Sequence, residues 1–228
     1  MLSLSLEGVV VRFPDLAEPA LDLPGLEVAA GSSVAVTGPS GAGKSTFINV
    51  VTGLERPSAG RVLWSGEDIA RLSEAARDRW RARNVGLVMQ DFHLFPGLSA
   101  IENVLLPARF RHIRLPAGLR DRAVALLVEV GIDAGARGIE TFSRGEMQRV
   151  AIARALLLQP GVIVADEPTA SLDGQSGAAV CALLTRLARA AGATLIVVTH
   201  DPALYGRLDR RIALAGGRRA DALHAEAS

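Results

Sequence analysis

The stretch Ser33-Val34-Ala35-Val36-Thr37-Gly38-Pro39-Ser40-Gly41-Ala42-Gly43-Lys44-Ser45 decides the fold. Residues 33–37 predict a short buried strand, and residues 44–54 have the apolar spacing of a helix. A glycine-rich loop between a strand and a helix turns its backbone N–H groups toward a phosphate, and the helix N-terminus adds partial positive charge. The alternative, a turn that only caps a helix, is disfavoured because the strand and the helix are both present.

The side chains at the end of this loop complete the predicted phosphate site. Lys44 can reach the β and γ phosphates of a nucleotide, and the Ser45 hydroxyl can bind Mg²⁺. Lys44 is the only lysine among 25 basic residues, so the compact ammonium is used here and arginine everywhere else. That bias favours a phosphate-binding role for Lys44.

The composition limits the classes of protein to consider. The chain has 228 residues, 49% of them hydrophobic, which suffices for one large globular domain. Its 25 basic and 24 acidic residues give a net charge of +1, which argues against a global field that recruits nucleic acid or an anionic membrane, so any local basic patch needs its own argument. The single cysteine, Cys181, is expected to be a buried structural thiol. We expect neither a membrane span nor a signal peptide, so any membrane part belongs to another polypeptide.

Short apolar runs predict two sheets. Residues 2–13, 21–28 and 61–64 favour a small sheet near the N-terminus. Residues 85–89, 162–165 and 194–199 are compact runs rich in valine and isoleucine, as expected for strands covered on both faces. Together with the strand at 33–37, this second set predicts a parallel sheet with flanking helices.

The segment between two of these parallel strands differs from them in composition and pattern. Residues 91–158 are rich in arginine and have helical patterns at 117–130 and 146–158. We interpret them as a helical lobe inserted into the α/β core. The segment after Gly216-Gly217 is polar and alanine-rich, and we expect it to be a frayed tail.

Two carboxylates follow the apolar run at 162–165. Asp166 is suited to hold the Mg²⁺ shell, while Glu167 is suited to polarise an attacking water. Two exposed acids that merely end a strand would be the default interpretation of an isolated pair. Downstream of a phosphate-binding loop, the pair favours nucleotide hydrolysis.

The chain resembles the ABC ATPase family from end to end, through six motifs in the family's order. Residues 38–45 match Walker A, Gln90 the Q-loop, 142–156 the signature and its helix, Asp166-Glu167 Walker B, 171–173 the D-loop and His200 the switch histidine. Taken singly, Gln90 could be a solvated strand end, Asp173 a turn former and His200 a helix-start residue. Order and spacing favour the family interpretation for all three.

The resemblance implies an α/β fold of the P-loop NTPase (RecA-like) type, with a parallel sheet core, an N-terminal antiparallel β subdomain and an inserted α-helical subdomain. It implies one ABC ATPase domain over residues 1–228. Within it, residues 1–90 and 159–216 form the core with its β subdomain, 91–158 the helical lobe and 217–228 a tail.

The resemblance also assigns roles to residues. Glu167, His200, Gln90 and Lys44 are expected to be catalytic, and Ser45, Gln90 and Asp166 are expected to bind Mg²⁺. ATP is expected to contact Phe13, Gly38, Pro39, Ser40, Gly41, Ala42, Gly43, Lys44, Ser45, Thr46, Gln90, Ser143, Gly145, Glu146, Asp166 and Asp173. Phe13 matches the family's adenine-stacking aromatic, although a core phenylalanine is the alternative.

The signature carries both a local and an intermolecular expectation. Ser143 and Glu146 form a Ser-x-x-Glu capping box, which predicts a helix start. The resemblance implies that this helix end faces the γ-phosphate of ATP bound by a second subunit, in a head-to-tail homodimer around two ATP. Arg144 stands where the family usually has glycine. Its side chain could restrict the approach to the phosphate or supply a cation there.

Residues 86–107 resemble the short subunits of the lipoprotein-release, macrolide-efflux and cell-division group. These bacterial ATPases work beside a separate transmembrane permease, which implies a peripheral position on the cytoplasmic face of the inner membrane. The side chains of Phe92, Leu94, Phe95 and Leu98 would receive the permease's coupling helix, or else form core of the lobe. His93 and His112 are expected to be surface residues.

Three functions stay open at this level. The first is an export or extraction ATPase that drives the membrane subunit. The second is a regulatory ATPase of the cell-division type, and the third is a soluble ABC ATPase or another phosphate-loop class such as a kinase. The balanced charge argues against nucleic acid as a partner.

Overall fold

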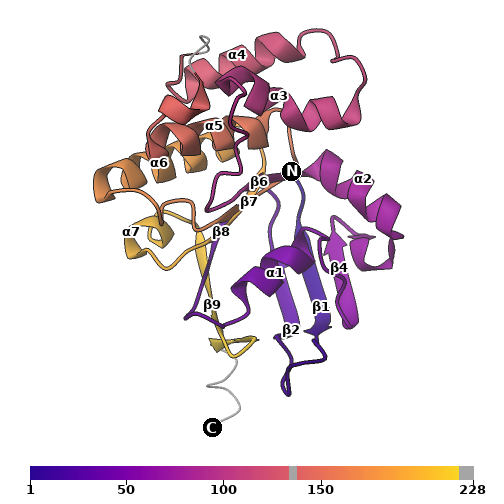
Figure 1. Cartoon of the computed structure of the whole chain (residues 1–228). Coiled ribbons are helices and arrows are strands. Elements are labelled where there is room, and N and C mark those ends of the chain that lie inside the picture. Colours follow the sequence, from indigo (N-terminus) through magenta and orange to yellow (C-terminus); the bar gives the residue numbers. More distant parts are fainter. Residues whose placement is uncertain (134–137, 221–228) are drawn as a thin grey trace.

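The computed structural model describes residues 1–133 and 138–220, and its core is a six-stranded sheet (Figure 1). The strand order is β10-β9-β3-β8-β7-β6, in which β10 alone is antiparallel to its neighbour. Every residue of the central strands β3 and β8 is buried, as predicted for a sheet covered on both faces. The strands are β3 (Ser33–Thr37), β6 (Val85–Val88), β7 (Val162–Asp166), β8 (Thr194–Val198), β9 (Arg210–Ala215) and β10 (Arg218–Arg219).

A second sheet of four antiparallel strands lies at the N-terminal side, in the order β2-β1-β4-β5. Buried and half-buried positions alternate along most of β1, which places its apolar residues on one face. That face packs with the helix after the phosphate loop in one buried cluster. The strands are β1 (Leu4–Val11), β2 (Leu21–Val28), β4 (Ala59–Trp64) and β5 (Glu67–Asp68).

The helices fall into a core set and an inserted set. The core set is α1 (Lys44–Val51), α2 (Glu74–Asn84), α6 (Gly174–Ala190) and α7 (Pro202–Tyr205). The inserted set, at the top of Figure 1, is α3 (Ala100–Arg111), α4 (Leu119–Glu129) and α5 (Arg144–Leu156). Short 3₁₀ turns occupy Ile69–Arg71 and Ile139–Thr141. Because α3, α4 and α5 lie between β6 and β7 in the chain, the predicted inserted lobe is confirmed.

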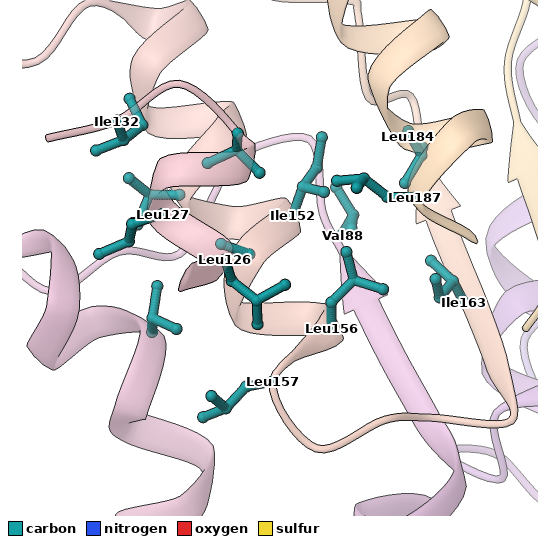
Figure 2. Close-up of a cluster of buried hydrophobic side chains, with 14 of the residues drawn as sticks. Val88, Leu126, Leu127, Ile132, Ile152, Leu156, Leu157, Ile163, Leu184 and Leu187 are labelled. Carbon is teal, nitrogen blue, oxygen red and sulfur yellow. The ribbon is translucent and has the colours of Figure 1, made fainter. Parts of the chain in front are cut away.

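One apolar cluster joins the lobe to the core sheet (Figure 2). Leu127 of α4 and Ile152 of α5 belong to the same buried cluster as Ile163 of β7 and Leu184 of α6. A Cβ atom at Gly86 of β6 would lie 2.5 Å from the carbonyl oxygen of Ala155, so glycine is required for this close approach of α5. The lobe and the sheet therefore share one core.

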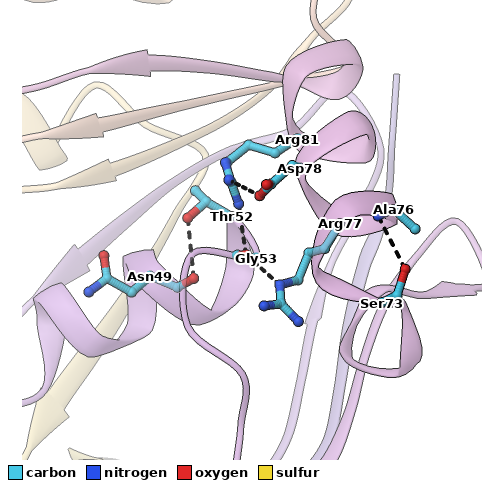
Figure 3. Close-up of polar contacts among 8 residues, drawn as sticks. All are labelled: Asn49, Thr52, Gly53, Ser73, Ala76, Arg77, Asp78 and Arg81. Carbon is cyan, nitrogen blue, oxygen red and sulfur yellow. Dashed lines mark hydrogen bonds and ion pairs between the residues drawn. The ribbon is translucent and has the colours of Figure 1, made fainter.

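The end of the phosphate-loop helix is fixed by arginines of α2 (Figure 3). The carbonyl oxygen of Gly53 accepts hydrogen bonds from Arg77 Nε and Arg81 Nη1, both at 2.8 Å. Gly53 directly follows Thr52, the C-cap residue of α1, so its carbonyl lies outside the helical hydrogen-bond pattern and is satisfied by these donors. These two bonds hold the end of α1 against α2.

Several elements differ from the sequence predictions. Helices α2 and α3 were not predicted, and α5 begins at Arg144 rather than at Glu146. Strand β10 continues the sheet to Arg219, so the boundary placed after residue 216 is too early, while 221–228 of the expected tail lie outside the described residues. Cys181 is buried, as predicted. Among the described helices, none is long and apolar enough to cross a membrane.

Candidate active site

Four chain segments leave the core sheet at one edge, and they carry the predicted motifs. Parallel strands have their carboxyl ends at the same edge. The strand β3 leads into the phosphate loop, and the register pairs Val88 of β6 with Ala165 of β7 and Ala165 with Val197 of β8. Gln90, Glu167 and His200, which follow these strands, therefore emerge at this edge together with the loop.

The phosphate loop has a conformation that requires glycine. Gly41 and Gly43 have φ angles of 77° and 92°, in the left-handed region. A Cβ atom at Gly43 would lie 2.6 Å from the carbonyl oxygen of Ala20, so a larger residue would clash there. Lys44 Nζ donates to the carbonyl oxygens of Gly38 at 2.7 Å and Pro39 at 2.8 Å. The ammonium group is thus held within the loop.

A cavity of about 530 Å³ opens beside this loop. Phe13, 37% exposed, lies in its wall. The lining is Phe13, Leu16, Ala17, Glu18, Pro19, Ala20, Ser40, Gly41, Gly43, Lys44, Ser45, Thr46, Gly216 and Gly217. The cavity therefore combines an exposed ring at one wall with the phosphate loop at another.

Two parts of this wall were missed in the sequence. The segment 16–20 carries no motif. Gly216 and Gly217 were placed at the edge of a tail, yet they form the turn between β9 and β10. Gly217 N donates to Ala42 O at 3.2 Å, and Gly217 O accepts from Asp22 N at 2.7 Å. The glycine pair between apolar and basic residues was the signal for a hairpin turn.

Glu167 is held in a strained backbone conformation. Its φ angle is 44°, which is uncommon for a residue other than glycine, and its N–H donates to Val198 O at 2.9 Å. Glu167 Oε1 lies 3.0 Å from His200 Nδ1. The other carboxylate oxygen, Oε2, is buried without a hydrogen-bond partner in the described structure. The side chain is thus turned into the site and oriented by the histidine.

Asp166 precedes Glu167 and lies in a region of concentrated negative charge. Burial raises the pKa of its carboxyl, the neighbouring Glu167 raises the pKa further, and Lys44 opposes both effects. The buried, unpartnered Oε2 of Glu167 and this repulsion would both be relieved by a cation. Together with the exposed Ser45 hydroxyl in the cavity wall, these oxygens fit the all-oxygen donor set of Mg²⁺.

The signature residues stand apart from that cavity wall, at the N-terminus of α5. The predicted capping box is present: Ser143 Oγ accepts from Glu146 N at 3.3 Å, and Ser143 N donates to Glu146 Oε2 at 2.8 Å. Ser143 is exposed, and Gly145 is half-buried. None of the three lines the cavity at the phosphate loop. They therefore present a separate, outward-facing helix end.

Asp173 marks the start of the neighbouring helix α6. Its Oδ1 accepts from Ser176 N at 2.9 Å and from Gln175 N at 3.1 Å, and these bonds lower the pKa of the carboxyl. A Cβ atom at Gly145 would lie 3.9 Å from Ser176 Cβ, so the starts of α5 and α6 adjoin. The expected D-loop and signature thus form one surface.

Helix α5 also holds the turn that follows Gln90. Phe92 and His93 have φ angles of 57° and 46°, and Arg154 Nη2 donates to Phe92 O at 2.6 Å. The Arg144 guanidinium lies over the Phe92 ring. Phe92 is consequently buried, whereas Phe95 is exposed. His93 and His112 are exposed, as predicted.

The fold and this site define a class: an ATPase with a phosphate-binding loop and an inserted helical lobe. A family model described as "ABC transporter" matches residues 21–170, and the chain belongs to this family. It is an ATP-binding and ATP-hydrolysing subunit of the ABC type.

Relatives and solved structures agree with this assignment. The lipoprotein-releasing system ATP-binding protein LolD of Anaeromyxobacter dehalogenans is 43% identical over 201 residues, 88% of this chain and 84% of the relative. LolD of Chromohalobacter salexigens is 44% identical over 200 residues, 87% of this chain and 84% of the relative. The dimeric ATP-binding cassette MJ0796 bound to ADP and Pi has a TM-score of 0.84 at 34% identity, covering 95% of this chain and 96% of that chain.

Proposed function

We propose that this chain is the ATPase subunit of a bacterial ABC system that extracts lipid-anchored protein from the inner membrane. In this proposal it dimerises around two ATP and drives a separate transmembrane permease from the cytoplasmic face. The similarity to LolD over most of both chains supports the substrate class. The main support for dimerisation around ATP is that the exposed signature lies apart from the phosphate-loop cavity of its own subunit.

The cavity beside the phosphate loop supports the way in which ATP is bound. Its size and lining fit a nucleotide, with Phe13 against the base and the backbone of Ser40, Gly41 and residues 43–46 around the phosphates, while Gly38, Pro39 and Ala42 do not line the cavity. Ser45, Asp166 and Gln90 would hold Mg²⁺, which would neutralise charge on the phosphate oxygens. Lys44 would exchange its bonds to the loop carbonyls for bonds to phosphate.

Hydrolysis needs a base at the edge where the strands end. Glu167 would accept the proton of the attacking water. His200 would fix the Glu167 carboxylate through the 3.0 Å contact, so that one oxygen faces the water. The strained backbone at Glu167 supports this role, because such strain is concentrated at functional sites.

A second copy of the chain would complete the site. The exposed start of α5 has a half-buried glycine, Gly145, and a positive helix end, both suited to the γ-phosphate held by a partner. Since the signature does not line its own cavity, each subunit would supply the signature to the other. Monomers would then hydrolyse ATP poorly.

A groove of about 520 Å³ supports coupling to the permease. It lies between α2, β6, α3 and α5, next to the turn after Gln90, and its walls are mainly apolar but include four arginines. Of the four side chains expected here, only Phe95 lines the groove, while Phe92 is buried and Leu94 packs on the lobe core. An amphipathic helix of the permease fits such a groove.

The test uses Glu167→Gln, which retains the size of the side chain but removes the base. With ATP and Mg²⁺ this protein should sediment as a dimer and hydrolyse at least about a hundredfold more slowly than wild type. Lys44→Ala, as the control, should remain monomeric under the same conditions. Co-expression with a membrane subunit encoded by a neighbouring reading frame should yield a co-purifying complex. Rapid hydrolysis by Glu167→Gln, or failure to co-purify, would contradict the proposal.

A further inference from the structure

A basic segment with exposed apolar side chains lies at the outer end of the helical lobe. Between Glu102 and Asp121 the chain has four arginines and no acidic residue. Arg109, Arg111 and Arg114 are exposed. We name residues 109–114, with the sequence Arg-Phe-Arg-His-Ile-Arg, the basic loop; it comprises the last turn of α3 and the residues that follow.

Two large apolar side chains of the basic loop point into solvent. Phe110 is 80% exposed and Ile113 is fully exposed. The segment is nevertheless anchored, because Leu115 and Leu119 pack against the lobe core and Arg111 Nη1 donates to Ala82 O of α2 at 2.9 Å. A fixed backbone therefore presents apolar side chains and cations together.

The negative charge at the C-terminal end of α3 explains only part of this pattern. Cations in the last turn of a helix interact favourably with its negative end, which accounts for Arg109 and Arg111. It does not account for Arg114, which follows the helix, or for the exposed Phe110 and Ile113. Exposed apolar residues flanked by arginines are typical of segments that lie at a membrane interface.

The position of the basic loop relative to the groove indicates its orientation. Phe110 and Arg111 form part of the groove wall, which we propose receives the permease. This step rests on the proposed function: the groove would face the membrane, so the adjoining basic loop would face it too. Ile113 and Arg114 are not part of the groove wall, so they are free to contact another surface.

We propose that the basic loop binds the anionic phospholipid surface beside the permease. Arg109 and Arg114 pair with lipid phosphates, while Ile113 enters the boundary between headgroups and acyl chains. The local excess of positive charge complements the negative surface of the cytoplasmic leaflet. This contact would keep the ATPase at the membrane when the nucleotide dimer opens.

Vesicle sedimentation of the purified chain, without any permease, tests this inference. Wild type should bind vesicles that contain phosphatidylglycerol and lose binding at high salt or on pure phosphatidylcholine. The double variant Arg109→Ala with Arg114→Ala should bind about 25-fold more weakly, at about fivefold per arginine. Ile113→Ser should weaken binding about tenfold with the charge unchanged.

Matched controls carry the same changes elsewhere on the surface. Arg186→Ala with Arg189→Ala on α6 removes two exposed arginines, and Val128→Ser on α4 removes an exposed apolar side chain. Both should bind anionic vesicles like wild type. Equal binding by wild type and by the Arg109, Arg114 double variant would overturn the proposal. A second outcome would also overturn it: wild type does not bind vesicles, and the double variant no longer co-purifies with the permease. That result would show that the basic loop contacts a protein partner instead.

The outcome is separable from that of the proposed function. The ATP-dependent dimer of Glu167→Gln requires neither vesicles nor the basic loop. If that dimer forms but wild type does not bind anionic vesicles, only the proposed lipid contact is contradicted. If vesicles bind but neither the dimer nor the co-purified permease is found, the proposed function fails instead.

Discussion

The Arg144 guanidinium lies 5.5 Å from the centroid of the Phe92 ring. Arg144 is the first residue of α5, where the positive end of the helix disfavours a cation. Its contact with the ring offsets this cost through a cation–π interaction. The contact links the helix that carries the signature to the turn that follows Gln90, within one subunit.

We expect Arg144→Gly to leave ATP affinity unchanged and to lower kcat about two- to fivefold. An exposed cation–π contact contributes about 0.5–1 kcal/mol, and its loss would let the signature helix and the turn move independently. Nucleotide titration would measure the affinity, and steady-state phosphate release the turnover. An unchanged turnover would remove any special role for Arg144.

A double-mutant cycle separates this contact from direct action on phosphate. If Arg144 acts through Phe92, then Phe92→Leu should reproduce the loss, and the double variant should be no slower than either single variant. If Arg144 instead touches phosphate, Phe92→Leu should be nearly neutral. Additive effects would show that the two residues act separately.

His200→Ala should lower kcat about tenfold or more with little change in ATP affinity. The histidine orients Glu167 through the 3.0 Å contact and does not line the nucleotide cavity. His200→Gln, which retains a hydrogen-bonding group, should recover part of the rate. A large loss of affinity in His200→Ala would indicate a different role for this side chain.

Gly43→Ala should abolish ATP binding, whereas Gly41→Ala should weaken it only moderately. Both glycines have a left-handed backbone, so either alanine adds strain of about 1 kcal/mol. Only Gly43 has a backbone oxygen, Ala20 O, at 2.6 Å from the added Cβ atom, and no heavy atom lies within 4 Å at Gly41. Titration with a fluorescent ATP analogue would compare them, and equal affinities would contradict the steric argument.

Much of the fold follows from local patterns, and of the two helices that were not predicted, α2 and α3, the second had clear signals. The strand before the phosphate loop and the parallel strands are continuous apolar runs, which need no tertiary information. The helix α3 has buried residues at 101, 104, 105 and 108 and a capping box from Ser99 to Glu102. The sequence analysis placed this segment in the helical lobe but assigned no separate helix to it.

The geometry of the site could be predicted only in part. Strand ends place Asp166 and Glu167 at the right edge, because parallel strands share a direction. The positive φ of Glu167 and the burial of Phe92 under Arg144 depend on contacts between distant segments, which a single sequence does not reveal. The same holds for the cavity wall at Gly216 and Gly217, which is formed when β9 returns beside β3.

Removing the arginines behind the phosphate-loop helix should destabilise the protein. Arg77→Ala with Arg81→Ala deletes both donors to Gly53 O, and each charged hydrogen bond contributes about 1.5–3 kcal/mol before solvent access is considered. Because water can replace part of the stabilisation from these hydrogen bonds, we expect the free energy of unfolding to fall by about 2 kcal/mol in urea titrations. Arg71→Ala, which removes a highly exposed arginine nearby, should change it by less than about 0.5 kcal/mol.

Stability should also depend on Asp209, which joins the start of β9 to the start of β3. Asp209 Oδ2 accepts from Ser33 Oγ at 2.7 Å and from Ser33 N at 2.8 Å, and these bonds lower the pKa of the carboxyl. A lowered pKa contributes stability that is complete above the unfolded value of about 4 and is lost as the pH falls through the folded value.

Wild type should therefore lose melting temperature below about pH 4 more steeply than Asp209→Asn, which has no charge to titrate. Since the Asp209 side chain is 50% exposed, we expect the difference to correspond to less than about 1 kcal/mol. Melting curves recorded between about pH 3 and 7 would measure it. If the melting temperatures of the two proteins change equally with pH, the bonds to Ser33 do not favour the carboxylate. The strand pairing that positions the phosphate loop would then be independent of this charge.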